Sequence, residues 1–194
     1  MAQVDAGSNG RRRFLVGATA VVGGVGMVGA AVPFVASWNP SAKARAAGAP
    51  VKVDISKIEP GQQITVEWRG KPVWLLKRTP EMLKELDEHK DDLADPLSER
   101  EQQPVYAKNI HRSRKEELLV VVGICTHLGC SPQYLPEVVP NESWGGYYCP
   151  CHGSKFDLAG RVTKGVPAPA NLVVPPYMYV DDNTVIVGVD EENA

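Results

Sequence analysis

The feature that most constrains this chain is an uncharged run of 23 residues, from Phe14 to Ala36, close to the amino terminus. As an α-helix a run of this length extends about 35 Å, enough to cross a hydrocarbon core of about 30 Å. The apolar region of a cleaved secretory signal is shorter, at about 7 to 15 residues. The run therefore predicts a single transmembrane helix over residues 14–36.

Three arginines, Arg11–Arg13, stand directly before this run and predict its orientation. Because basic flanks stay on the cytoplasmic side, residues 1–13 are expected in the cytoplasm and everything after Ser37 across the membrane. The segment Arg11–Leu15 also resembles the twin-arginine export signal, whose pathway moves proteins that are already folded, commonly around a cofactor. Either role requires the same topology.

The segment after the run, residues 37–50, is short and rich in alanine. Two small-x-small sequences in it, Ala42-Lys43-Ala44 and Ala44-Arg45-Ala46, are of the kind that a signal peptidase accepts. The length of the uncharged run favours a retained helix over a cleaved signal. Residues 37–50 are then a linker that lets the following domain move as on a hinge.

Charge is divided unevenly along the chain. Residues 1–50 carry a net charge of +4 and residues 51–194 a net charge of −6, which leaves −2 overall. A nearly neutral chain with an acidic body does not suit nucleic-acid binding, so no nucleic-acid partner is expected. The basic end is explained by membrane topology.

Residues 51–194 have the pattern of a mostly β domain. Short apolar or alternating runs predict strands at 62–68, 72–77, 118–124, 171–174, 178–180 and 184–187. Residues 94–117 are polar with little periodicity, which predicts a long loop or an irregular insertion. The expected fold is an antiparallel β domain with one side insertion.

One helix is expected in this domain. Thr79 is a suitable N-cap and Pro80 suits the first helical position. The residues expected on its buried face are Met82, Leu83, Leu86 and Leu93. This helix is interpreted as core packing.

All four cysteines and two of the four histidines lie in two short segments. The first reads Cys125-Thr126-His127-Leu128-Gly129-Cys130 and the second Cys149-Pro150-Cys151-His152-Gly153-Ser154, with 18 residues between them. Each segment supplies one Cys–His pair and one further cysteine. The other two histidines, His89 and His111, are distant from the cysteines in sequence and are expected on the solvated surface.

Three simpler interpretations of these segments fit less well. A structural zinc site needs four ligands, whereas six are present, and the spacing of Cys149 and Cys151 is too short for such a site. Two ordinary disulfides would leave the adjacent histidines without a role. Thiol redox catalysis normally shows Cys-x-x-Cys beside a βαβ pattern, which this sequence lacks.

The two segments resemble the motifs of Rieske proteins, Cys-x-His-x-x-Cys and Cys-x-x-His, with an extra cysteine before the second histidine. The resemblance implies one [2Fe–2S] cluster in loops 125–130 and 149–154. Its implied ligands are two cysteines on one iron and two histidines on the other, namely Cys125, Cys149, His127 and His152.

The two remaining cysteines also have an implied role. By the same resemblance Cys130 and Cys151 form a disulfide that ties the two loops together. Rieske ferredoxins and ring-hydroxylating dioxygenases have the four ligands without this disulfide, so the extra pair points to the quinol-oxidising subfamily.

Neutral imidazole ligands have two chemical consequences. An oxidised cluster with two thiolates and two imidazoles is close to neutral, so it accepts an electron at a higher potential than a four-cysteine cluster, about −150 to +300 mV. The outer ring nitrogens can also lose a proton, more readily when the iron is ferric. Electron and proton uptake are thereby coupled, as quinol oxidation requires.

The residues after the second motif are expected to tune the potential. In the family, a serine in the position of Ser154 donates its hydroxyl to a bridging sulfide, and a tyrosine in the position of Phe156 donates to a ligand sulfur. Phe156 has no hydroxyl to donate, which predicts a potential in the lower part of the quinol-oxidising range. Residues 165–169 resemble the proline loop that covers the cluster, and with Leu128 they predict an apolar docking tip.

Taken together, the chain resembles the iron–sulfur subunits of bacterial ubiquinol–cytochrome c reductases, the cytochrome bc complexes. The resemblance implies a periplasmic head on a helix in the bacterial inner membrane, in contact with membrane lipid. It implies ubiquinol as substrate, with His152 and His127 as the catalytic residues, and His152 as the quinol contact. Its partners would be a cytochrome b and a c-type cytochrome in a dimeric complex.

Two alternatives stay open on the sequence alone. The small subunit of a periplasmic arsenite oxidase also combines a twin-arginine signal with a Rieske domain, but its cluster relays electrons without touching quinol. A structural metal-binding module would hold zinc. The insertion at 94–117 and the linker favour the quinol-oxidising interpretation.

Overall fold

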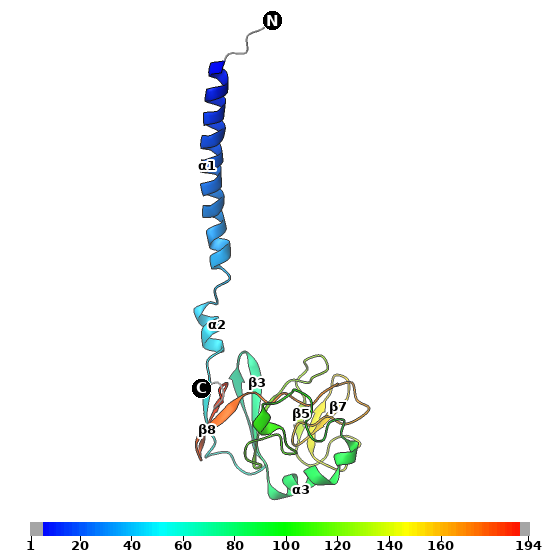
Figure 1. Ribbon diagram of the computed structural model, residues 1–194. Helices are drawn as coiled ribbons and strands as arrows, with labels where there is room; N and C mark the ends of the chain where they lie inside the picture. The colour runs from blue at the N-terminus through cyan, green and yellow to red at the C-terminus, as the bar shows by residue number, and fades with distance from the viewer. Residues whose placement is uncertain (1–5, 191–194) are drawn as a thin grey trace. The chain divides into compact units, whose positions relative to one another are not determined.

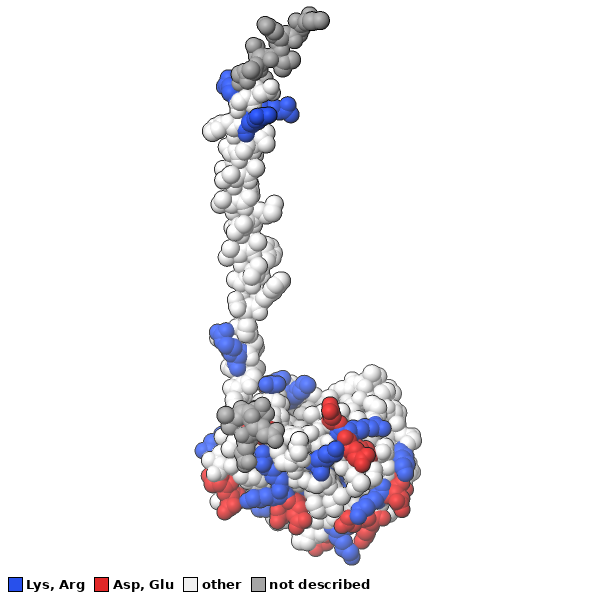
Figure 2. Space-filling model, viewed as in Figure 1, with Lys and Arg blue, Asp and Glu red and all other residues white. Residues whose placement is uncertain are grey.

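The computed structural model describes residues 6–190 and divides into two compact units, of which one ends at Ala46 and the other begins at Ala47. The first unit contains the helix α1 (Ala6–Ala36). Within α1, Asn9–Ala36 is long and apolar enough to cross a membrane, with a mean hydropathy of 2.0. Its uncharged length is white in Figure 2, with basic side chains near the amino-terminal end. A short helix, α2 (Ala42–Ala47), lies in the predicted linker.

The second unit, here called the head domain, is built from antiparallel sheets of three strands each (Figure 1). The first sheet has the order β1 (Val51–Asp54), β9 (Thr184–Val187), β8 (Tyr177–Asp181). The second has the order β2 (Gln63–Trp68), β3 (Lys71–Lys77), β4 (Leu118–Val122). The third has the order β5 (Gln133–Leu135), β6 (Gly146–Cys149), β7 (Ser154–Asp157). The mostly β, antiparallel fold class predicted from the sequence is confirmed.

The core of the head domain lies on the second sheet. Every residue of β4 is buried, and so are the four central residues of β3, because both faces of this sheet are covered. Trp74 of β3 stacks on Tyr147 of β6, with ring centroids 5.0 Å apart. A Cβ atom at Gly123 would lie 2.2 Å from the Trp74 ring, so glycine is required there. The stacking of Trp74 on Tyr147 fixes the third sheet against the core.

The predicted helix is present as α3 (Pro80–Glu88), with the Thr79 hydroxyl accepting the backbone N–H of Met82. Met82 and Leu86 are buried as expected. Leu93 is buried too, but it lies beyond α3, after the 3-10 turn η1 (Lys90–Asp92), and pairs with Thr163. Its placement on the helix face was therefore wrong.

The strand predicted at 171–174 does not form. Leu172 and Val174 are buried, but their amides bond to two different partners, the carbonyls of Gly160 and Gln102. The segment is thus an extended connection fixed by isolated hydrogen bonds, and periodicity alone could not distinguish it from a strand.

The insertion at 94–117 is irregular, as predicted, with one 3-10 turn, η2 (Val105–Ala107). It is nevertheless packed into the domain. The fully buried Arg112 donates to the carbonyls of Leu172, Ala159 and Gly160. The insertion has no regular apolar pattern, and the hydrogen bonds of the Arg112 guanidinium hold it in the domain instead.

The expectation of solvated surface histidines was wrong for His89, which is 7% exposed. Its ring stacks on Trp144, with centroids 4.6 Å apart, and its Nε2 lies 3.6 Å from the carboxylate of Asp157. His111 is half-buried, and its Nε2 lies 3.5 Å from Glu116.

Candidate metal centre

The two cysteine-containing loops have the same local structure. The amide of Gly129 donates to the carbonyl of Cys125, and the amide of Gly153 donates to the carbonyl of Cys149. Both glycines have positive φ values, 86° and 78°, which favour a residue without a side chain. Each loop therefore turns back within two residues of its histidine.

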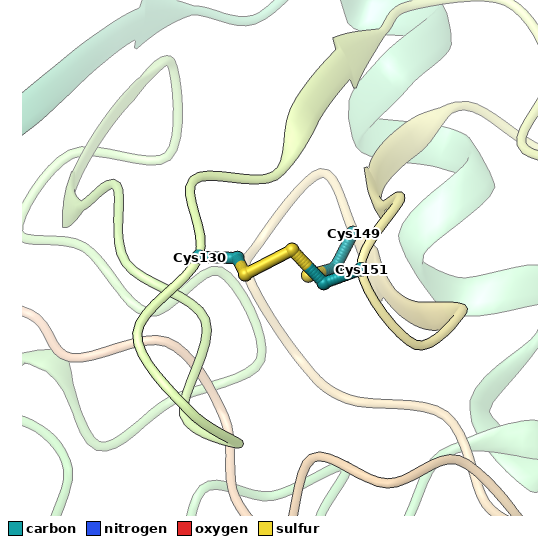
Figure 3. A group of neighbouring side chains, drawn as sticks. All are labelled: Cys130, Cys149 and Cys151. Carbon is teal, nitrogen blue, oxygen red and sulfur yellow. A yellow bond between two sulfur atoms is a disulfide. The ribbon is translucent and has the colours of Figure 1, made fainter.

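A disulfide joins the loops. Cys130 and Cys151 are bonded to each other, while Cys125 and Cys149 are free and buried. Figure 3 shows the disulfide crossing between the loops with Cys149 beside it. The sulfurs of Cys130, Cys149 and Cys151 lie within 4.8 Å of one another. Because two of them are bonded together, these three do not form a set of metal ligands.

The two free thiols lie against each other. The sulfur of Cys125 is hydrogen-bonded with Cys149 and also accepts from the backbone N–H of His127 and the hydroxyl of Ser154. Burial raises the pKa of the Cys125 thiol, the hydrogen bonds from His127 and Ser154 oppose this rise, and the net direction is upward. A metal ion that bound here would replace both thiol protons.

The two motif histidines meet at the same place. The rings of His127 and His152 have centroids 4.7 Å apart and are nearly perpendicular, at 86°. His127 is half-buried, whereas His152 is exposed. Two buried thiols next to two imidazoles are the donor set that a Rieske cluster needs, so the residues fit this cofactor.

The segment at 165–170, called the proline loop below, is attached to both cysteine-containing loops. The Ser154 hydroxyl accepts the amide of Ala168 at 3.0 Å, and the Thr126 hydroxyl donates to the carbonyl of Ala170 at 2.5 Å. Beside it Leu128 is 73% exposed. No local pattern pointed to the Thr126 contact, since its partner is 44 residues away.

Comparison with known proteins decides between the alternatives. Residues 50–177 match the family "Rieske [2Fe-2S] domain", and residues 1–41 match "Ubiquitinol-cytochrome C reductase Fe-S subunit TAT signal". The chain is 60% identical, over 95% of its length and 91% of the relative's, to the ubiquinol-cytochrome c reductase iron-sulfur subunit of Allochromatium vinosum. The chain belongs to the Rieske iron–sulfur subunits of ubiquinol–cytochrome c reductase.

A second relative agrees with this assignment. The iron-sulfur subunit of ubiquinol-cytochrome c reductase from Rhodospirillum rubrum is 45% identical over 96% of both chains. Among solved structures, a chain of a hyperthermophilic respiratory complex III is 27% identical, over 89% of this chain and 98% of that one, with a TM-score of 0.49. As a Rieske subunit the protein carries a [2Fe–2S] cluster and is part of a membrane-bound oxidoreductase complex.

Proposed function

We propose that Cys125 and Cys149 bind one iron of the cluster and that His127 and His152 bind the other. The pairing of the two buried sulfurs, and of the two rings, supports this division. The disulfide between Cys130 and Cys151 holds the two ligand-bearing loops together from outside the ligand set. The assembled site serves to oxidise ubiquinol and to pass one electron to a c-type haem.

His152 is the proposed contact to ubiquinol, and the single observation that carries this is its exposure next to the half-buried His127. The bound cluster supplies one-electron redox chemistry at the inner side of the ring. The outer nitrogen of the His152 ring accepts the hydrogen bond of a quinol hydroxyl and takes its proton as the electron leaves. The exposed Leu128 in the first ligand loop gives the tip an apolar surface for docking onto cytochrome b.

The proposed domain organisation follows the charge pattern. Residues 1–13 are cytoplasmic, residues 14–36 cross the bacterial inner membrane among its lipids, and residues 51–194 form a periplasmic head. Residues 37–50 serve as the hinge on which the head moves from cytochrome b to the c-type cytochrome, in a complex that is dimeric. The long apolar span within α1 and its basic flank support this topology.

Electron paramagnetic resonance on native membranes tests the proposed quinol site. With the cluster reduced, addition of a quinone-site inhibitor is expected to change the line shape of the Rieske signal, because the ligand contacts a histidine that is bound to iron. A line shape that is insensitive to every quinone-site ligand would contradict quinol docking at this tip, and would favour an internal relay as in arsenite oxidase.

Substitution of Phe156 by tyrosine tests the predicted tuning of the cluster. Phe156 is fully buried and lies two residues after Ser154 on β7, so the two side chains share a face of the strand. A hydroxyl added there is expected to donate to a ligand sulfur and to raise the reduction potential by about 40 mV, the equivalent of about 1 kcal/mol for one electron. Redox titration measures the shift, and an unchanged potential would show that position 156 does not face the ligand sulfurs.

A further inference from the structure

We propose that Arg100 is a positioning residue that holds the proline loop closed from the side of the insertion. Its guanidinium donates a hydrogen bond to the carbonyl of Pro169 across 69 positions of sequence. Ser154 and Thr126 hold the loop from the cysteine-containing loops, whereas Arg100 holds it from outside the metal centre. The inference rests on the proposed function only in that the closed loop shapes the tip that docks ubiquinol.

The backbone of Arg100 is fixed by a neighbouring carboxylate. The side chain of Asp95 accepts the amides of Glu99 at 2.9 Å and Arg100 at 3.1 Å. The side-chain amide of Gln103 donates to the carbonyls of Ser98 and Arg100. The segment is thus a compact turn, and the guanidinium reaches Pro169 from a defined base.

The same turn is joined to both flanks of the proline loop. Asn171, fully buried just after the loop, donates to the carbonyl of Asp95 at 3.1 Å. Its side-chain oxygen accepts the amide of Val162, just before the loop, at 2.9 Å. One side chain therefore links the two ends of the loop to the turn that carries Arg100.

The hydrogen bond from Arg100 to Pro169 differs in strength and in position from the bonds that Ser154 and Thr126 make with the loop. A guanidinium donor makes a charge-assisted hydrogen bond, which is stronger than a bond between neutral groups. Pro167 and Pro169 have no amide hydrogens, so this part of the loop depends on its carbonyls and on Ala168 for hydrogen bonds. Removal of the Arg100 side chain leaves the neutral hydrogen bonds of Ala168 with Ser154 and of Ala170 with Thr126 to resist opening of the loop.

The test is hydrogen–deuterium exchange of the loop in the purified, cluster-loaded complex, with Arg100→Ala, Arg100→Lys and the native protein compared. The amide of Ala168, which Ser154 protects, is the reporter within a peptide that spans residues 162–172. Lys108→Ala is the matched control, because Lys108 is an exposed cation of the same insertion. Ubiquinol KM and kcat, and the paramagnetic resonance signal of the cluster, are measured on the same preparations.

Arg100→Ala is expected to speed exchange in this peptide about fivefold, with Arg100→Lys in between and Lys108→Ala unchanged. The ubiquinol KM should rise by up to the same factor while kcat and the cluster signal are retained, since only closed loops dock. Unchanged exchange, or exchange that rises equally throughout the head domain, would each overturn the proposal. Absence of ubiquinol oxidation in the native complex would instead refute the proposed function, and the exchange measurement would still report on the contact.

Discussion

His127→Gln and His152→Gln are each expected to abolish the Rieske signal and to reduce ubiquinol oxidation to background, a loss on the order of a hundredfold or more. Glutamine keeps much of the size and polarity of histidine but lacks the ring nitrogen that is proposed to bind iron. The two rings lie against each other, and the free, buried thiols of Cys125 and Cys149 are in the same two loops, so in the proposed site loss of either ring leaves one iron without half of its protein ligands. Paramagnetic resonance and iron content of purified complex measure the result.

His111→Gln is the matched control for these two variants. His111 is half-buried in the insertion, where its Nε2 lies 3.5 Å from Glu116 and its carbonyl accepts from Arg78. This variant should retain the cluster signal and its activity. A His152→Gln protein with a full complement of iron and a native signal would remove His152 from the ligand set and, with it, the proposed quinol contact.

Arg161→Met should destabilise the head domain by about 3–5 kcal/mol, because it leaves a buried carboxylate without its charge partner. Arg161 and Asp157 are both fully buried, and the Arg161 Nε lies 2.6 Å from the Asp157 carboxylate. Arg161 also donates to the carbonyls of Leu86 and Pro96, so the pair connects β7 to α3 and to the insertion. The temperature at which the complex loses its cluster signal should fall accordingly.

The pH dependence of the stability difference shows whether the broken ion pair is what destabilises Arg161→Met. Burial is the largest single effect and would raise the pKa of Asp157, but the charge of Arg161, together with hydrogen bonds from His89 and from the Arg161 amide, outweighs burial and lowers the pKa to about 2. The ion pair therefore stabilises the native protein fully above the unfolded pKa of about 4, and this contribution is lost as the pH falls toward 2. In Arg161→Met the pKa of Asp157 should rise, so the difference from the native protein should be largest near neutral pH.

Lys84→Ala provides the comparison with an exposed ion pair. Lys84 and Glu88 lie 3.8 Å apart on the solvated side of α3, and removal of such a pair should change stability by no more than about 0.5 kcal/mol. Equal effects of Lys84→Ala and Arg161→Met would contradict the role given to the buried pair.

The sequence predicted best what depends on local pattern. The uncharged run forms the long helix α1, and Thr79 caps α3 as expected. The strands with apolar or alternating residues, β2, β3, β4, β8 and β9, were predicted to within two residues. Residue type and spacing sufficed for these elements because each forms most of its own hydrogen bonds or buries a regular face.

The strands that carry the metal centre were missed. β6 reads Gly-Tyr-Tyr-Cys and β7 reads Ser-Lys-Phe-Asp, and neither has an apolar alternation that marks a strand. A Cβ atom at Gly146 would lie 2.1 Å from the carbonyl of Phe156, so this residue is selected by close backbone approach and not by strand propensity. Such a requirement depends on a partner that only the folded chain supplies.

Buried polar groups were the other failure of prediction. His89, Arg112 and Arg161 look like surface residues in the sequence, and each is buried by a partner distant along the chain. Their partners are carbonyls and one carboxylate, brought together by the insertion and the connection at 159–172. The polar sequence of the insertion therefore did not mean that its side chains are exposed to solvent.

The position of Cys149 has a consequence for the order in which this protein matures. Its thiol lies within 4.8 Å of both sulfurs of the Cys130–Cys151 disulfide, so as a free thiolate it could attack that bond and exchange partners. In the proposed cluster site, coordination of Cys149 to iron would withdraw it from this reaction. Correct pairing is therefore secured when the cluster is inserted first and the disulfide closes afterwards. In the proposed topology the two compartments impose this order. The reducing cytoplasm keeps Cys130 and Cys151 as thiols, and their disulfide forms after export to the periplasm.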